Sequence, residues 1–313
     1  MRMRPNEDYL DEELAYLLGA IVARGEIFEE RDMTTILIAY PFKNLIAEGL
    51  TKSYNAPDKL SLGLDGIVNL ASNLGFNVTK QSSETECRLV IKVMTESLPM
   101  RVLKSHLSPG RSYREFHVPE AIFNSKESIQ REFVRGYVDV AGHVRKSNNY
   151  IDGRHRVYID VLNENWHLPV ELCTLLQDHL RVPVQTITWG HPNIRDPNLS
   201  DYNAGRQRSW AREHQIKVFA DVFMRVGFYI SYKGEILEEL GDYNKKNFPK
   251  RSAEFCPGPK RITDKKPQHP GENDPQLPDR IRGKHFDSYW QICEVMGCPK
   301  FRGRVKLFKW LMW

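Results

Sequence analysis

The sequence predicts an α+β protein made of two similar halves, and three observations favour this fold class. Residues 16–27 (YLLGAIVARGEI) and 133–144 (FVRGYVDVAGHV) form two similar phrases, each with two glycines separated by five residues. The offset between the phrases is 117 residues at both glycines. The same order of predicted helices and strands follows each phrase. With 313 residues, of which 41% are apolar and 27% charged, the chain is long enough to bury a large core.

Each phrase predicts a helix that packs tightly against a partner. Gly19 and Gly136 lie inside the expected helices, where glycine costs about 1 kcal/mol relative to alanine. Close approach of a second backbone compensates for such a cost, so we expect the two helices to pack on each other about a pseudo-two-fold axis. Gly25 and Gly142 stand where each helix should end.

In the first half, the hydrophobic pattern predicts the order α-β-β-α-β-β-α. Asp11, Glu12 and Glu13 favour a helix start at this point because they are acidic. The expected elements are a helix at 11–24, strands at 26–29 and 34–40, a short helix at 44–48, a helix from 58 to about 75, strands at 78–81 and 88–93, and a helix at 95–107.

The second half repeats this order. The expected elements are a helix at 125–141, strands at 143–146 and 156–162, a helix at 167–180, strands at 182–188 and 214–219, and a last helix that begins at 220–227. A long insert at 189–212 is rich in arginine and separates the last two strands. The agreement in order between the halves is the main support for the fold.

Composition also bounds the location of the protein. The longest apolar run, residues 14–23, stops at Arg24 and is too short to span a membrane. The N-terminus lacks the apolar segment of a signal peptide. Five cysteines in so long a chain do not indicate a disulfide scaffold. We therefore expect a cytoplasmic monomer without a membrane partner.

Charge is distributed unevenly over three expected regions: a first repeat at 1–117, a second repeat at 118–244 and an extension at 245–313. The extension has 16 Lys and Arg against 7 Asp and Glu, a net charge of +9, whereas residues 1–244 carry −4. A basic region favours a polyanion partner such as nucleic acid.

These segments resemble the two motifs of the LAGLIDADG homing endonuclease family in its single-chain, two-repeat form. The motifs correspond to residues 17–25 (LLGAIVARG) and 134–142 (VRGYVDVAG), and residues 118–142 are similar to the lead-in to the second motif. The resemblance covers about residues 9–240. It implies two αββαββα halves that meet through the motif helices and offer their sheets to the major groove of double-stranded DNA.

The resemblance also implies that cations on the strand faces and in the arginine-rich insert contact DNA, and Arg24, at the end of the first motif helix, would face a phosphate. The candidates are Arg24, Lys92, Arg154, Arg156, Arg195, Arg206, Arg208, Arg212 and Lys217. For each of them, the alternative is an ordinary exposed charge.

The family's metal-binding acids are absent from their motif positions. The resemblance places an acid just before the last glycine of each motif, where the pair holds divalent cations such as Mg²⁺. Here these positions are Arg24 and Ala141, and neither side chain can bind Mg²⁺. Glu26, Asp139 and His143 are the displaced catalytic candidates nearby, and ordinary structural roles are the alternative for them.

The sequence therefore favours a DNA-binding protein that resembles a homing endonuclease with a degenerate active site and is not an enzyme. The first alternative is an endonuclease with relocated acids, which would require Mg²⁺. The second is a splicing cofactor that binds structured RNA.

The extension also contains a possible structural Zn²⁺ site. Thiolate and imidazole groups suit tetrahedral zinc, and the chosen ligands are Cys256, His269, Cys293 and Cys298, with His285 in reserve. The alternative is that the three cysteines are buried free thiols. Cys87 and Cys173 lie in apolar surroundings, and we expect them in the core.

Overall fold

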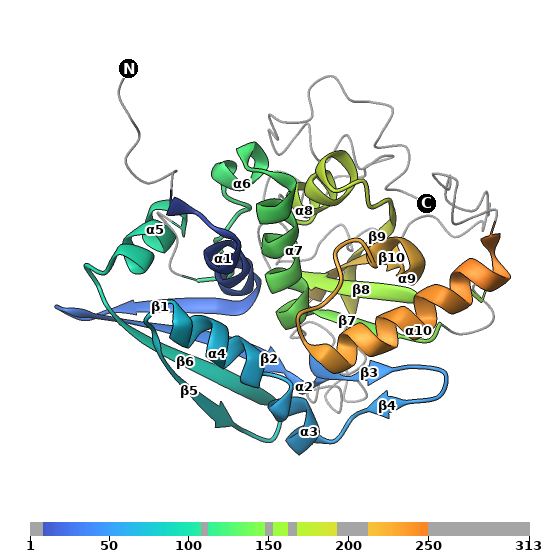
Figure 1. Ribbon diagram of the computed structural model, residues 1–313, viewed down its shortest axis with the longest axis horizontal. Helices are drawn as coiled ribbons and strands as arrows, with labels where there is room; N and C mark the ends of the chain where they lie inside the picture. The colour runs from blue at the N-terminus through green and yellow to red at the C-terminus, as the bar shows by residue number, and fades with distance from the viewer. Residues whose placement is uncertain (1–8, 108–111, 148–152, 162–167, 193–211, 250–313) are drawn as a thin grey trace.

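The computed structural model describes residues 9–107, 112–147, 153–161, 168–192 and 212–249. The chain forms an α+β fold in which two helices, α1 (Glu12–Arg24) and α7 (Glu127–Ala141), lie side by side between two sheets (Figure 1). The predicted fold class is thereby confirmed.

The first half follows the predicted order. After α1 come β1 (Gly25–Glu29), β2 (Met33–Pro41), α3 (Pro57–Leu62), α4 (Asp65–Asn73), β5 (Asn77–Ser82), β6 (Glu86–Met94) and α5 (Leu98–Leu107). The four strands form an antiparallel sheet in the order β1-β2-β6-β5. In β2, buried and more exposed residues alternate, so one face of this sheet packs on the core and the other faces outward.

The second half repeats this topology. Its elements are α6 (Glu120–Asn124), α7, β7 (Gly142–Arg145), β8 (Arg156–Val161), α8 (Leu168–Thr174), the π-helical turn η3 (Leu175–His179), β9 (Val184–Pro192), β10 (Arg212–Phe219) and α9 (Ala220–Phe223). The strand order β7-β8-β10-β9 corresponds strand for strand to β1-β2-β6-β5. The repeated order of elements in the sequence therefore produces two sheets of the same topology.

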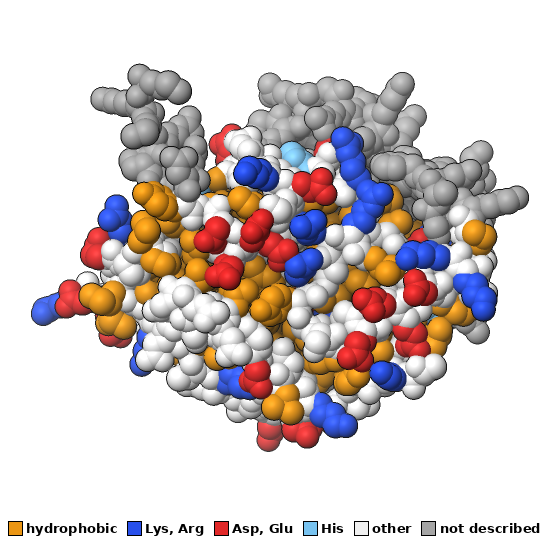
Figure 2. All heavy atoms as spheres, viewed as in Figure 1, with side chains coloured by type: hydrophobic (Ala, Val, Ile, Leu, Met, Phe, Trp, Pro, Cys, Tyr) orange, Lys and Arg blue, Asp and Glu red, His pale blue; other side chains and the backbone are white. Residues whose placement is uncertain are grey.

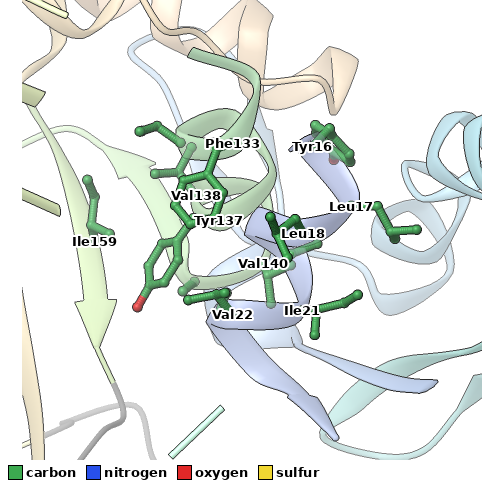
Figure 3. Packing of buried hydrophobic residues seen from close by; sticks show 14 of the residues in the cluster. Tyr16, Leu17, Leu18, Ile21, Val22, Phe133, Tyr137, Val138, Val140 and Ile159 are labelled. Atoms are coloured by element: carbon green, nitrogen blue, oxygen red, sulfur yellow. The ribbon is translucent and has the colours of Figure 1, made fainter. Parts of the chain in front are cut away.

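The helix pair is as close as the glycines predict. A Cβ atom on Gly19 would lie 1.9 Å from the carbonyl oxygen of Phe133, and one on Gly136 would lie 1.9 Å from the carbonyl oxygen of Tyr16. The two contacts are reciprocal, as expected for related helices about a pseudo-two-fold axis. Figure 3 shows Leu17 of α1 and Tyr137 of α7 on opposite sides of this contact.

The glycines at the helix ends terminate α1 and α7 as predicted. Gly25 and Gly142 have extended backbones, with φ of −93° and −100°, instead of the left-handed conformation common after helices. The chain passes from each helix directly into a strand. A Cβ atom would lie 2.6 Å from the carbonyl oxygen of the residue four positions earlier, Ile21 or Val138, so this transition leaves room only for glycine.

Several predicted boundaries also differ. The expected helix from 58 to 75 is two helices, because the chain turns at Gly63 between α3 and α4. Pro57, not Asp58, begins α3. The expected short helix at 44–48 is α2 (Phe42–Leu45), followed by β3 (Ala47–Glu48).

A short hairpin and a long helix that were not predicted join the halves. The strands β3 and β4 (Ser53–Tyr54) form a hairpin in the first half, and β3 pairs in parallel with β7 of the second. This pairing extends the second sheet to the order β4-β3-β7-β8-β10-β9. The helix α10 (Ser231–Asn247), drawn in orange in Figure 1, crosses beside this hairpin. It runs past residue 244, where we expected the second repeat to end.

Among the described residues, no helix has both the length and the apolar character that crossing a membrane requires.

Candidate nucleic-acid interface

The C-terminal ends of α1 and α7 meet polar side chains of the second sheet. We call this cluster the seam and define it as Arg24, Asn44, Ala141, His143 and Asp160. Asn44, which lies on α2, connects its members. Its Nδ2 donates to the carbonyl oxygen of Ala141 at 3.0 Å and to Oδ2 of Asp160 at 2.9 Å, and its Oδ1 accepts from Nη2 of Arg24 at 3.4 Å.

Asp160 is the ionised carboxylate of the seam, although it is 3% exposed. Burial alone would raise the pKa of Asp160. The charges of His143 and Lys43, together with hydrogen bonds from Gln215 and Asn44, outweigh burial and lower this pKa to about 2. Because Gln215 donates to Oδ1 and Asn44 to Oδ2, both oxygens already accept protein hydrogen bonds.

Sequence reasoning missed Asp160. It is the single acid of the otherwise apolar or basic strand β8, RVYIDV. A buried strand seldom carries an ionised residue unless the residue has partners, and this contrast was the available signal. Its partners come from α2, β7 and β10, which no sequence pattern brings together.

Arg24 lies at the predicted place but is buried, with 8% exposure. It ends α1, and its guanidinium turns to Asn44. A cation in the last turn of a helix also complements the helix dipole.

The three displaced catalytic candidates lie in different surroundings. Glu26 is exposed on β1, where its backbone bridges to Ser112. His143 is buried, stacks on the ring of Tyr158 at 5.1 Å, and has its Nδ1 3.8 Å from Oδ2 of Asp160. Of the three, the hydrogen-bond and ion-pair contacts connect only His143 to the seam.

Asp139 is completely buried in the helix pair. Its Oδ2 accepts from the hydroxyl of Tyr16 at 2.8 Å and from the backbone N–H of Tyr229 at 2.9 Å. Burial raises the pKa of Asp139, and the charge of Lys233 partly opposes that rise. Lys233 itself donates to the carbonyl oxygens of Asp139 and Gly142 at the end of α7. Asp139 thus connects α1, α7 and the start of α10.

Two predicted DNA contacts, Arg154 and Arg156, are buried instead of exposed, each at 1%. Arg154 forms an ion pair with Asp221 at 3.0 Å, and its guanidinium lies 3.6 Å from the centroid of the Phe219 ring. Arg156 donates to Gln185 and, at 3.0 Å, to Oγ of Ser147. Strand alternation alone did not reveal these partners, which accept hydrogen bonds from the two guanidinium groups inside the protein.

The other predicted contacts differ in accessibility. Lys92 is exposed on the outer face of β6, and Lys217 is partly buried on β10. Arg212 begins β10, but its side chain lies outside the described set. Three more arginines, Arg195, Arg206 and Arg208, fall outside the described residues, as do all the zinc candidates: Cys256, His269, His285, Cys293 and Cys298.

No three His, Cys, Asp or Glu side chains in the described ranges form a group that could hold a metal ion. Cys87 and Cys173 are buried free thiols, as predicted for core residues.

The polar face of the second sheet carries cations over aromatic rings. The guanidinium of Arg145 lies 4.7 Å from the centroid of Tyr158, and Nζ of Lys217 lies 6.0 Å from the same centroid. Burial and the charges of Arg156 and Arg145 lower the pKa of Lys217 to about 8. By contrast, Figure 2 shows acidic and basic side chains interspersed on the face that carries α10.

Comparison with known proteins found no matching family profile and no matching curated protein. Among solved structures, the chain is similar to mesophilic variants of the homing endonuclease I-DmoI, with a TM-score of 0.34, 16% identity, and coverage of 70% of this chain and 88% of that one. A second similar structure is an I-DmoI variant in complex with its target DNA and manganese, with a TM-score of 0.36, 17% identity, and coverage of 72% and 97%. A third is I-DmoI with DNA and manganese, at a TM-score of 0.34, 16% identity, and coverage of 72% and 96%. The fold assignment rests on the strand order of this chain.

Proposed function

We propose that this chain binds double-stranded DNA across the outward faces of its two sheets, without a metal-dependent nuclease site at the seam. The seam is the observation that carries the proposal. Arg24 and Ala141 stand at the ends of the paired helices, and Asn44 bridges them. This arrangement supports the proposal, because neither Arg24 nor Ala141 offers a carboxylate at these helix ends.

The residues of the seam do not fit Mg²⁺. This ion requires several oxygen ligands in a nearly octahedral arrangement. The seam offers the one carboxylate of Asp160, whose two oxygens already accept hydrogen bonds from Gln215 and Asn44. The guanidinium of Arg24 adds a fixed positive charge nearby. DNA binding should therefore need no divalent cation.

Exposed cations on the first sheet and partly buried cations on the second support DNA as the ligand. Arg88 and Lys92 are exposed on β6, while Arg145 and Lys217 lie on the polar face of the second sheet. The solved structures of I-DmoI include complexes of that protein with its target DNA. In this proposal, cations bind phosphates, and polar side chains of the strands contact base edges.

Selection from a random duplex library in the presence of EDTA tests the binding. We expect a preferred sequence whose affinity is unchanged when EDTA is replaced by Mg²⁺. Structured RNA serves as the competitor. Consistently tighter binding to that RNA than to any selected duplex would overturn the proposal.

An endonuclease with relocated acids is the second candidate, because Asp160 places one ionised carboxylate at the seam. Incubation of a plasmid library with Mg²⁺ or Mn²⁺ distinguishes it from the proposed function. We expect no specific double-strand cuts. Cuts that disappear in Asp160→Asn or Glu26→Gln would establish the endonuclease instead.

A further inference from the structure

The equivalent positions of the two sheets carry different chemistry. The strand registers align Tyr158 with Leu37, since these residues lie opposite His143 and Glu26, the residues that follow the helix-ending glycines. The same registers place Lys217 at the position of Val90. The centre of the polar face is therefore basic and aromatic in the second sheet, but apolar in the first.

Two further pairs of equivalent positions also carry cations in the second sheet and uncharged residues in the first. Arg145 corresponds to Phe28, and Arg156 corresponds to Thr35, which lies opposite Phe28. The exposed cations of the first sheet, Arg88 and Lys92, stand away from its centre on the registers of Ala39 and Thr35. Two sheets with one topology therefore present positive charge in different places.

At the centre of the second sheet, two cations have no ion-pair partner among the described residues, although the charge of Asp160 acts on Lys217. In the described part of the chain, the side chains of Arg145 and Lys217 form neither a hydrogen bond nor an ion pair, and both contact the ring of Tyr158. Asp160, the nearby acid, is occupied by Asn44 and Gln215. Arg156 adds a third positive charge on the same face.

The charges of Arg156 and Arg145 repel that of Lys217, and the charge of Asp160 offsets this repulsion only in part, so a further anion would stabilise the cluster. Arg145 and Lys217 are both only partly buried. The ring of Tyr158 fixes both cations through cation–π contacts. A tetrahedral oxyanion, with several acceptor oxygens, matches a guanidinium and an ammonium that converge on one ring.

We propose that Arg145, Lys217 and Tyr158 form a phosphate-binding site that the first sheet lacks. The inference rests on the proposed function for the source of the phosphate, which is the nucleic-acid backbone. The protein would then hold one backbone phosphate near the middle of the second sheet and none at the related place in the first. Its DNA target would be bound unequally by the two halves.

Inorganic phosphate is the first probe. The thermal unfolding midpoint of the full chain is measured in phosphate and in chloride of equal ionic strength. We expect phosphate to raise the midpoint of the wild type, because a ligand of the folded state stabilises it. The increase should disappear in Lys217→Met and Arg145→Gln, and remain in Arg88→Gln, which removes a cation from the other sheet. An equal increase in all four proteins, or none in the wild type, would overturn the site.

Lys217→Arg keeps the experiment informative if Lys217→Met does not fold. This variant retains the charge and should retain the phosphate effect, whereas a fall to the Arg145→Gln level would contradict the proposal.

Duplex affinity separates the two sources of phosphate. If a DNA backbone phosphate occupies the site, Arg145→Gln should make the dependence of log affinity on log salt less steep. The slope should become less negative by about 0.9, the value for one phosphate contact. A phosphate effect on stability with an unchanged slope would assign the site to a free phosphate compound and reject the nucleic-acid source. If the wild type binds no duplex at all but is still stabilised by inorganic phosphate, the proposed function is rejected and the anion site is retained.

Discussion

Asp160 is a buried residue that remains charged because other groups solvate it in place of water. Two amides donate to its oxygens, and His143 and Lys43 supply positive charge. Removing one member of such a buried network leaves the others without partners, so single substitutions are costly. The seam therefore depends on a few polar side chains and can be tested one residue at a time.

Asp160→Asn should reduce the free energy of unfolding by about 2 kcal/mol at neutral pH. The pKa of this carboxyl is about 2 in the folded protein and about 3.8 in the unfolded chain, so its ionised form stabilises the folded state. This contribution is present above about pH 3.8 and is lost as the pH falls through about 2. Urea unfolding from pH 7 to pH 3 measures it. The difference from the wild type should shrink below about pH 4, while the exposed control Asp32→Asn should show little effect at any pH.

Lys217 predicts a pH dependence of DNA binding. Its pKa in the free protein is about 8, so the ammonium loses its proton as the pH rises above this value. Duplex affinity should then fall by up to about tenfold per pH unit. Titratable or charged groups that face Lys217 on this sheet are His143, Arg145, Arg156, Tyr158 and Asp160.

Lys217→Arg is the matched variant for this measurement, since a guanidinium stays charged throughout the range. Affinity measured from pH 7 to 9.5 at constant ionic strength should be nearly flat in this variant. An equally steep fall in both proteins would show that another group titrates.

At the scale of elements, the glycine contacts between α1 and α7 and the packing of α10 on the β3–β4 hairpin hold the halves together. Glu239 of α10 accepts from the backbone N–H groups of Leu50 and Thr51, both at 2.9 Å. Hydrogen bonds from Thr51 and Leu50 outweigh desolvation and lower the pKa of Glu239. One carboxylate therefore satisfies the turn of a hairpin that has only two residues in each strand.

Gly19→Ala should destabilise the protein by about 3 kcal/mol or more, because the new Cβ would meet the Phe133 carbonyl at 1.9 Å and neither backbone can move freely. Gly234→Ala in α10 is the control. Its Cβ would lie 4.0 Å from the nearest atom, so it should be neutral or stabilise by up to about 1 kcal/mol. Chemical denaturation of both variants gives the comparison, and equal effects would contradict the close helix contact.

Glu239→Ala should release the hairpin turn without unfolding the protein. Hydrogen exchange at the amides of Leu50 and Thr51 should become faster, since these amides lose their acceptor. Glu238→Ala, on the same helix and exposed, should leave this exchange unchanged. Unaltered exchange in Glu239→Ala would show that the carboxylate does not hold the turn.

At the scale of the whole molecule, two sheets of one topology differ in the placement of their charges. If both bind DNA, exposed cations of the first sheet should add to the salt dependence of binding. Arg88→Gln combined with Lys92→Gln should lower the slope of log affinity against log salt by about 0.9 for each lost phosphate contact. Lys245→Gln combined with Lys246→Gln removes the same charge from exposed positions on α10 and should leave the slope unchanged.

Much of the architecture was predictable from sequence, because the repeated α-β-β-α-β-β-α order determines how each half can fold. Elements without a periodic signal were not: β3 and β4 have two residues each, and the largely polar α10 has only a weak apolar stripe. Arg24 was placed correctly at the helix end, whereas Asp160 and Tyr158 were missed. Their importance arises from neighbours on other strands, and strand register is not visible in local sequence.

The parallel pairing of β3 with β7 limits where halves of related proteins can be exchanged, in the laboratory or by recombination during evolution. A chimaera that joins the first half of this protein to the second half of a relative would supply a foreign edge to the recipient sheet. The linker between the repeats is therefore not sufficient as a crossover point. Residues 42–54 should come from the same protein as the second half, because β3 extends the sheet of that half. Exchange of whole repeats as independent modules should yield poorly folded hybrids unless that segment is transplanted as well.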